Sequence, residues 1–216
     1  MWCIPEITPE YIERMEDVLD IYEKTYNLEE PVICFDEKSV QLLKDCREPI
    51  PLNKSGGIRK VDSEYIRCGT ANIFAAVEPK GGKHFTYVTA NRKGAAFAKI
   101  INRIANIYSQ AKTIHLVMDN LNTHKLKSLT DFYGEEKGKE IWNRFTIHYT
   151  PKHGSWLNQA ELELSILSRQ CLGKSRTDDI DSLNKKIRAW NKIVNKNKLI
   201  IKWKFTTNEA RAKFKY

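Results

Sequence analysis

The chain has 216 residues, of which 36 are Lys or Arg and 27 are Asp or Glu, so its formal net charge is +9 and its pI is about 9.2. This length predicts one domain or at most two small ones. A hydrophobic fraction of 41% supports a packed core and excludes a disordered or fibrous chain. The longest apolar runs, at 32–35 and 199–201, are far shorter than the roughly 20 residues of a membrane-spanning helix.

The cysteines and the N-terminal residues indicate the compartment. Five cysteines are scattered along the chain, without a C-x-x-C pair or a histidine at the spacing of zinc sites, which predicts reduced thiols. Residues 1–6 lack the basic and apolar regions of a secretory signal. We therefore expect a cytoplasmic protein that has no membrane partner.

Charge is distributed unevenly along the chain. Residues 1–35 contain nine acids and two bases, a net charge of −7, so the rest of the chain carries +9 − (−7) = +16. Residues 182–216 contain eleven bases and the single acid Glu209, a net charge of +10. A basic body with a basic tail favours a polyanionic partner, because neutralised phosphates release counterions. A solvated surface that binds nothing in particular is the alternative for the tail.

The first part of the chain predicts a helix followed by strands. Thr8-Pro9 is typical of a helix start, and apolar residues at helical spacing extend the expected helix over 8–26. A buried strand is expected at 32–35, ending at Asp36. Residues 47–89 alternate turn residues with β-branched and aromatic segments, which predicts an antiparallel meander.

The remaining chain alternates helical and strand patterns. The expected helices lie at 92–111, 123–142 (interrupted by Gly134 and Gly138), 158–172 and 179–195, and the expected strands at 114–118, 145–149 and 203–206. This order predicts an α/β fold with a mixed sheet and helices on its faces.

Two aspartates directly follow expected strands, and a glutamate lies on a later helix. Asp36 and Asp119 each come after a strand, where ligands of open α/β sheets gather. Glu161 lies on the helix after the next strand. Carboxylates are hard ligands for divalent cations, and two cations about 4 Å apart can activate an oxygen nucleophile and stabilise a leaving oxygen. The pattern indicates metal-dependent chemistry on phosphodiesters.

Each carboxylate also has a structural alternative. An aspartate after a strand often begins a turn, and Glu161 stands at capping-box spacing from Asn158. Glu163 is a rival ligand on the same helix. At about 100° per residue, Glu161 and Glu163 flank the apolar face of the helix about equally, so periodicity leaves the choice open.

Three segments resemble the catalytic blocks of a known family. They are Cys-Phe-Asp-Glu-Lys-Ser at 34–39, Val-Met-Asp-Asn-Leu-Asn-Thr-His at 117–124, and Tyr-Thr-Pro-Lys-His-Gly-Ser-Trp-Leu-Asn-Gln-Ala-Glu at 149–161. In this order they resemble the three blocks of bacterial DDE transposases, most closely those of the insertion sequence 630 family, relatives of the mariner transposases. The resemblance covers roughly residues 30–172, and residues 2–6 resemble the linker that precedes the catalytic domain.

The resemblance implies an RNase H-like fold, with a mixed five-stranded sheet flanked by helices. It implies that Asp36, Asp119 and Glu161 are the catalytic residues and hold two Mg²⁺ ions, for which Mn²⁺ can substitute. The family's Asn-x-x-Glu block selects Glu161 over Glu163. It also implies double-stranded DNA as a partner, a homodimer, association with the bacterial nucleoid and no small-molecule cofactor.

Other polar residues in the blocks are candidates for supporting or DNA-contacting roles. These candidates are Asn120, His124, Lys152, His153 and Asn158. His84, His115 and His148 fall in strand patterns and are expected to be structural.

The expected organisation has three parts: a linker and acidic helix at 1–30, the catalytic core at 31–175, and a basic helical extension packing on the core at 176–216. Relatives carry N-terminal helix-turn-helix modules, and these are expected to be absent here. The expected function is that of a transposase catalytic domain, cleaving and rejoining phosphodiester bonds at element ends. The alternatives are a catalytically incompetent DNA-binding remnant and another RNase H-like nuclease such as a resolvase.

Overall fold

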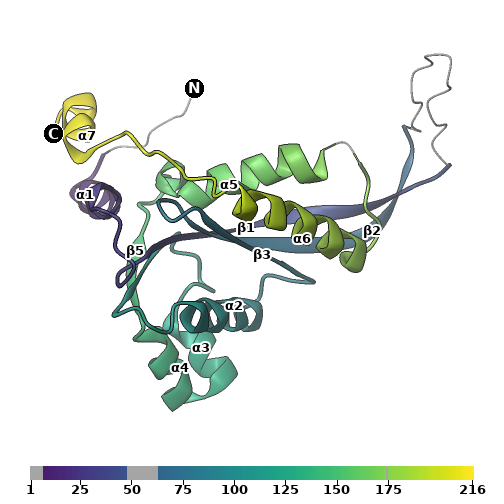
Figure 1. Cartoon of the computed structure of the whole chain (residues 1–216), viewed down its shortest axis with the longest axis horizontal. Coiled ribbons are helices and arrows are strands. Elements are labelled where there is room, and N and C mark those ends of the chain that lie inside the picture. Colours follow the sequence, from purple (N-terminus) through teal and green to yellow (C-terminus); the bar gives the residue numbers. More distant parts are fainter. Residues whose placement is uncertain (1–6, 48–62, 174) are drawn as a thin grey trace.

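A five-stranded mixed sheet forms the centre of the computed structural model, which describes residues 7–47, 63–173 and 175–216 (Figure 1). The strands lie in the order β3-β2-β1-β4-β5. Their bounds are Val32–Asp45 for β1, Tyr65–Glu78 for β2, Lys83–Thr89 for β3, Ile114–Met118 for β4 and Phe145–Tyr149 for β5. β1 pairs antiparallel with β2 and parallel with β4, which confirms the predicted mixed sheet.

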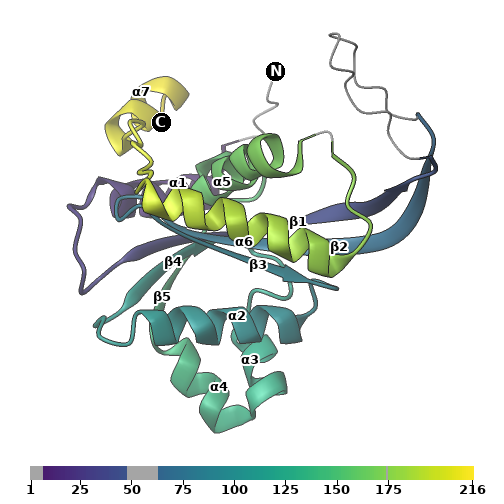
Figure 2. The same cartoon turned by 45° about the vertical axis from the view of Figure 1, so that its right-hand side comes forward.

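Helices cover both faces of the sheet (Figure 2). One face packs against α2 (Gly94–Ile107), α3 (Leu126–Tyr133) and α4 (Glu135–Trp142), and the other against α1 (Pro9–Glu23), α5 (Gln159–Leu167) and α6 (Ile180–Lys196). Because side chains alternate along a strand, Phe35 enters the first core and its neighbour Cys34 enters the second. Both side chains are fully buried.

Local signals explain where several helices begin and end. Thr8 caps α1 by accepting a hydrogen bond from the Tyr11 amide at 3.2 Å, and Pro9 occupies the first turn, which confirms the expected start. Gly134, at a φ of 86°, separates α3 from α4 within the expected helical segment 123–142. The helix expected over 158–172 is α5 followed by a π-helical turn, Ser168–Leu172.

The strand that contains Asp36 is longer than the sequence predicts. β1 continues to Asp45, so the expectation that Asp36 marks the end of its strand is wrong. The physical reason is β2, which pairs with β1 on both sides of Asp36 and therefore satisfies the backbone of the polar residues that follow. A register shift between Leu42 and Leu43 lies opposite Gly69, whose φ is 109°.

The meander expected at 47–89 is confirmed in part. The segments 65–68 and 71–77 belong to one strand, β2, and β3 pairs antiparallel with it. Residues 48–62, with the expected turns at Pro49, Pro51 and Gly56–Gly57, lie outside the described residues, as does the segment 2–6.

The strand expected at 203–206 is wrong. This segment has no regular secondary structure and leads into a helix that the sequence did not predict, α7 (Thr207–Phe214). The Trp203 and Phe205 side chains pack in the core beneath α1 instead of entering the sheet, and the Trp203 indole donates a hydrogen bond to the Phe205 carbonyl at 2.7 Å. Thr206 and Glu209 form a capping box, which starts the helix.

Part of the basic tail neutralises the acidic first helix. The Arg211 guanidinium donates to both Glu16 oxygens at 2.7 and 2.9 Å, and the Thr207 hydroxyl donates to Asp20 at 2.8 Å. Charges at the two ends of the chain therefore compensate each other within the fold. In the part of the chain that the structure describes, no helix is long and apolar enough to cross a bilayer.

Candidate active site

Asp36 of β1 and Asp119, the first residue after β4, occupy equivalent positions along adjacent parallel strands. Cys34 of β1 pairs with Val117 of β4, so Asp36 and Asp119 each come two residues further along. Because side chains alternate along a strand, both aspartates continue the face to which Cys34 and Val117 belong. That face is covered by the first turn of α5, through Ala160. The topology thus brings two carboxylates together from positions 83 residues apart in the sequence.

Asn158 fixes the start of α5 against β1. Its side-chain oxygen accepts a hydrogen bond from the Ala160 amide at 3.1 Å, and its amide group donates to the Phe35 carbonyl at 2.8 Å. Asn158 is buried, so it supports the site from within and is not itself available to DNA. This arrangement places the first turn of α5, with the half-buried Glu161, beside Asp36.

Replacing Asn158 with Ala is expected to lower the free energy of unfolding by about 2–3 kcal/mol, because it removes a helix cap and a buried hydrogen bond. Chemical denaturation of both proteins measures the difference. Asn106→Ala, on the exposed face of α2, is the matched control and is expected to change stability by less than about 0.5 kcal/mol. Equal stability of Asn158→Ala and the wild type would contradict the role assigned to Asn158.

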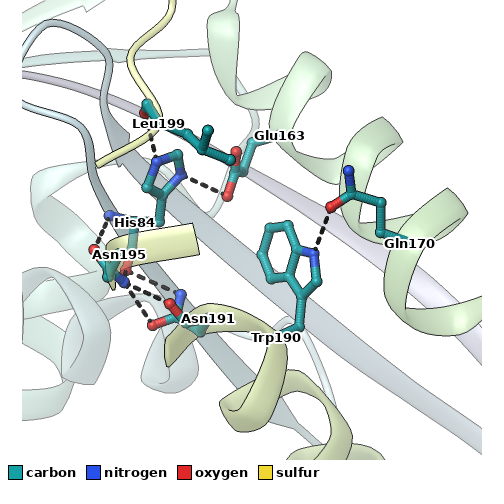
Figure 3. A network of polar contacts seen from close by, with 7 residues as sticks. All are labelled: His84, Glu163, Gln170, Trp190, Asn191, Asn195 and Leu199. Atoms are coloured by element: carbon teal, nitrogen blue, oxygen red, sulfur yellow. Dashed lines mark hydrogen bonds and ion pairs between the residues drawn. The ribbon is translucent and has the colours of Figure 1, made fainter. Parts of the chain in front are cut away.

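Glu163, the rival ligand, belongs to a different network (Figure 3). It is buried, and its carboxylate lies 2.8 Å from Nδ1 of His84 on β3. Nε2 of His84 donates to the Leu199 carbonyl at 2.8 Å, and the backbone of His84 is bonded by Asn191 and Asn195 of α6. This agrees with the structural role expected for His84. The pair orients α5 so that Glu163 points toward β3.

Electrostatics link Glu161 to the two aspartates. Burial raises the pKa of Asp36 to about 7; the Glu37 amide, 2.8 Å from Oδ1, lowers it, and the charges of Glu37, Asp119 and Glu161 raise it. In the described part of the chain, the Glu161 carboxylate has no hydrogen bond or ion pair, so it is not engaged in a capping box. The three carboxylates therefore share one electrostatic environment.

His124 holds Asp119 in place. Its Nδ1 lies 2.6 Å from Oδ1 of Asp119, and its Nε2 lies 3.1 Å from Oε2 of Glu37. Burial lowers the pKa of His124, but Asp119 and Glu37 outweigh burial and raise it to about 9. Burial raises the pKa of Asp119, but the contacts with His124 outweigh it and lower that pKa. Around neutral pH, His124 is therefore a buried cation between two carboxylates.

The donor set fits hard divalent cations. In residues 7–47, 63–173 and 175–216, no three His, Cys, Asp or Glu side chains are already gathered at metal-binding distances. However, Asp36 and Asp119 each use Oδ1 in hydrogen bonds within the protein, and in this same part of the chain Oδ2 of each has none. With the carboxylate of Glu161, these oxygens are the hard ligands that Mg²⁺ and Mn²⁺ prefer.

Asp119 opens onto a cleft of about 810 Å³. The candidates for DNA contact Asn120, Lys152 and His153 line it, together with Glu10 and Arg14 of α1, which form an ion pair at 2.8 Å. Lys152 and His153 are exposed, whereas His124 is buried and takes no part in the lining.

Two charged residues near the site were not identified from the sequence. Glu37 points to the face opposite Asp36 and pairs with His124, and Nη1 of Arg92 lies 3.7 Å from Oε1 of Glu37. Strand alternation after Asp36 predicts that Glu37 faces the other core, which is an unusual place for an acid. No local signal identifies Arg92.

Comparisons with known proteins identify the fold and the family. The search of solved structures matches "Crystal structure of the Mos1 mariner paired end complex with Mn" at a TM-score of 0.57 and 15% identity, covering 92% of this chain and 61% of that chain. The "Mos1 transposase paired-end complex with left transposon end" matches at a TM-score of 0.58 and 14% identity, again covering 92% of this chain and 61% of that chain. The "Mos1 Strand Transfer Complex" matches at 0.57 and 13%, covering 88% of this chain and 57% of that chain. No curated protein matches in the sequence search.

The protein has an RNase H-like fold, as the resemblance implied. The order of the strands, the helical layers on both faces and the structural matches agree on this fold. Residues 31–184 match the model of the DDE superfamily endonuclease family. The chain belongs to this family. It spans about three fifths of the length of the solved proteins that it resembles.

Proposed function

We propose that this chain is the catalytic domain of a transposase, a metal-dependent DNA endonuclease and strand transferase. The observation that carries the proposal is the placement of Asp36 and Asp119 level on neighbouring parallel strands, beneath the helix that bears Glu161. Membership of the DDE endonuclease family supports it, and so does the likeness to complexes named for paired ends and strand transfer.

In this proposal, Asp36, Asp119 and Glu161 hold two Mg²⁺ or Mn²⁺ ions. When bound, such ions lower the cost of deprotonating an attacking oxygen and stabilise the charge on a leaving oxygen. The open oxygens of the two aspartates and the unpartnered Glu161 carboxylate support this assignment. The raised pKa of Asp36 also supports it, since a cation would stabilise its charged form.

The other residues of the site act by positioning and by binding DNA. His124 orients Asp119, and Asn158 orients the helix that bears Glu161. Lys152, His153 and Asn120 line the cleft beside Asp119, where cationic and amide groups suit the phosphates of a DNA backbone. Water and then a DNA 3′-hydroxyl are the proposed nucleophiles.

The proposal extends to partners and organisation. Double-stranded DNA is the proposed substrate, a homodimer the working form, and the bacterial cytoplasm and nucleoid the location. The matched structures are named for paired ends and a transposon end, which supports DNA as the partner, and the dimer is proposed from the family resemblance alone. The proposed core is 31–175 with an extension at 176–216, which is supported by the packing of α6 over β3.

A cleavage assay tests the proposal. We expect the protein to nick supercoiled plasmid and short linear duplex in the presence of Mg²⁺ or Mn²⁺, and to stop when a chelator removes the metal. DNA binding with a steep salt dependence but no cleavage would instead identify a DNA-binding remnant. A strong preference for branched over linear DNA would identify a resolvase-like nuclease.

A further inference from the structure

We propose that a groove along β3, between α2 and α6, binds the phosphodiester backbone of DNA. β3 is an edge strand of the sheet, and α6 and α2 lie on opposite sides of it (Figure 2). The groove has a volume of about 670 Å³. We call it the β3 groove; its cations are Lys99, Arg103 and Arg188, and Thr86, Tyr87 and Asn91 also line it.

The β3 groove has one sign of charge. Lys99 and Arg103 come from α2 and Arg188 from α6, and no Asp or Glu is among the lining residues. All three cations are exposed, and in the described part of the chain none of them forms an ion pair with a carboxylate. Helices on the two sides of β3 thus present positive charge to one space, an arrangement that concentrates anions.

The cations of α3 and α4, by contrast, are neutralised within the protein. On α3 and α4, Lys127 pairs with Asp131 at 2.7 Å, and Lys139 with Glu135 at 2.7 Å. Lys137 pairs with Glu140 at 2.8 Å. The β3 groove differs from α3 and α4 in this respect, because among the described residues none of its three cations is paired with a carboxylate.

Aromatic rings hold two of the groove cations. The Arg103 guanidinium lies over the Tyr87 ring, 5.5 Å from its centroid, and the Lys99 ammonium lies 5.1 Å from the centroid of Phe132. A cation held over a ring keeps its N–H donors and its charge for another partner. This reduces the conformational entropy that binding a phosphate would cost.

The β3 groove adjoins the carboxylate site. Asp36 pairs with Ala75, and Ala75 pairs with Thr86 of the groove, so Asp36 and Thr86 are two strand spacings apart, roughly 10 Å. At the other end, Asn91 lines the groove, and the next residue, Arg92, reaches Glu37. A DNA segment in the groove would thus lie about three nucleotides from the site, at roughly 3.4 Å per nucleotide along one strand.

DNA fits this surface better than a peptide. An open sheet edge can accept an extended peptide through backbone hydrogen bonds, but peptide binding of this kind gives no reason for three cations without an acid. The binding of DNA phosphates does give a reason, because each phosphate that a cation neutralises releases counterions and so contributes to affinity. The choice of DNA as the polyanion rests on the proposed function.

A charge-removal experiment tests the inference. Lys99→Gln, Arg103→Gln and Arg188→Gln are combined in one variant, and Lys127→Gln, Lys137→Gln and Lys139→Gln in a control with the same change of charge. Fluorescence anisotropy of labelled duplex DNA, with salt varied from about 50 to 200 mM, measures affinity and its salt slope. We expect the groove variant to bind about tenfold or more weakly, with a slope smaller by about 2–3, and the control to bind as wild type does.

Other variants make the outcome decisive. Arg188→Glu alone, on an exposed position of α6, is expected to weaken binding more than Arg188→Gln and guards against misfolding of the triple variant. Asp119→Asn is expected to keep the groove-dependent binding while losing cleavage. If the groove variant binds DNA with wild-type affinity and slope, the inference is overturned, and cleavage by the wild type would then leave the proposed function standing. Equal losses in the groove and control variants would also overturn it.

Discussion

Replacing Asp119 with Asn is expected to reduce metal-dependent DNA cleavage by about a thousandfold. The two side chains have nearly the same shape, so the hydrogen bond from the Leu121 amide, at 3.3 Å, can persist while the charge is lost. Stabilisation of charge by a bound cation contributes several kcal/mol, and each ~1.4 kcal/mol is a factor of ten in rate. Single-turnover cleavage of a short duplex with Mg²⁺ measures the effect.

A matched control separates the site from the total charge. Asp131→Asn makes the same chemical change on the exposed surface of α3, where Asp131 pairs with Lys127. We expect this variant to cleave at the wild-type rate. Equal cleavage by Asp119→Asn and the wild type would refute the catalytic assignment, whereas a fall in both variants would point to a general effect of charge on DNA binding.

The sequence predicts much of this site because its main determinants are local. Asp36 and Asp119 follow apolar segments that are recognisable as strands, and Asn158 is recognisable as a helix cap three residues before Glu161. Parallel pairing of β1 with β4 is then enough to bring the aspartates level. Choosing Glu161 over Glu163, by contrast, required the resemblance, because both flank the apolar face of one helix.

The features that could not be predicted depend on partners distant in sequence. His84 and Glu163 are 79 residues apart, and nothing near either of them signals their contact. The polar half of β1 becomes a strand only because β2 returns along it. Trp203 and Phe205 have the pattern of a strand, yet they pack under α1, because burial in this core outweighs their local preference for a strand.

The basic residues of the tail, 182–216, differ in whether their charge is compensated within the fold, and composition alone does not distinguish them. Arg211 is bound to Glu16, so its charge is compensated by the acidic first helix. Arg188, on α6 in the same tail, faces the β3 groove and is not compensated by a carboxylate among the residues described. The excess charge relevant to DNA is therefore located by the packing of α6 and α7, not by the count of basic residues.

Below about pH 6.5, replacing Glu163 with Gln is expected to lower the free energy of unfolding by about 3–5 kcal/mol, because removing one partner of a buried ion pair leaves the other charge unpaired. His84 contacts the Glu163 carboxylate through Nδ1 and donates to the Leu199 carbonyl through Nε2 (Figure 3). In the Glu163→Gln variant, the protonated imidazole of His84 has lost this carboxylate partner.

Glu161→Gln, the same change two residues earlier on α5, is the matched control. Its carboxylate has no partner among the described residues, so we expect wild-type stability with loss of cleavage. Wild-type stability of Glu163→Gln would contradict the assigned pair.

The dependence of stability on pH provides an independent measure of the same pair. Burial lowers the pKa of His84, but Glu163 and the Leu199 carbonyl outweigh burial and raise it above the ordinary value of about 6.5. A raised pKa in the folded state means that the pair's stabilisation is complete below about pH 6.5 and is lost as pH rises through the folded-state pKa. We therefore expect chemical denaturation to show that the free energy of unfolding of the wild type falls as pH rises through this range, and that it falls less in Glu163→Gln. Asp119 and Glu37 raise the pKa of His124 to about 9, so His124 adds a further fall in the free energy of unfolding between about pH 6.5 and 9. This fall is expected in both proteins. The difference between the two proteins therefore isolates the contribution of His84 and Glu163.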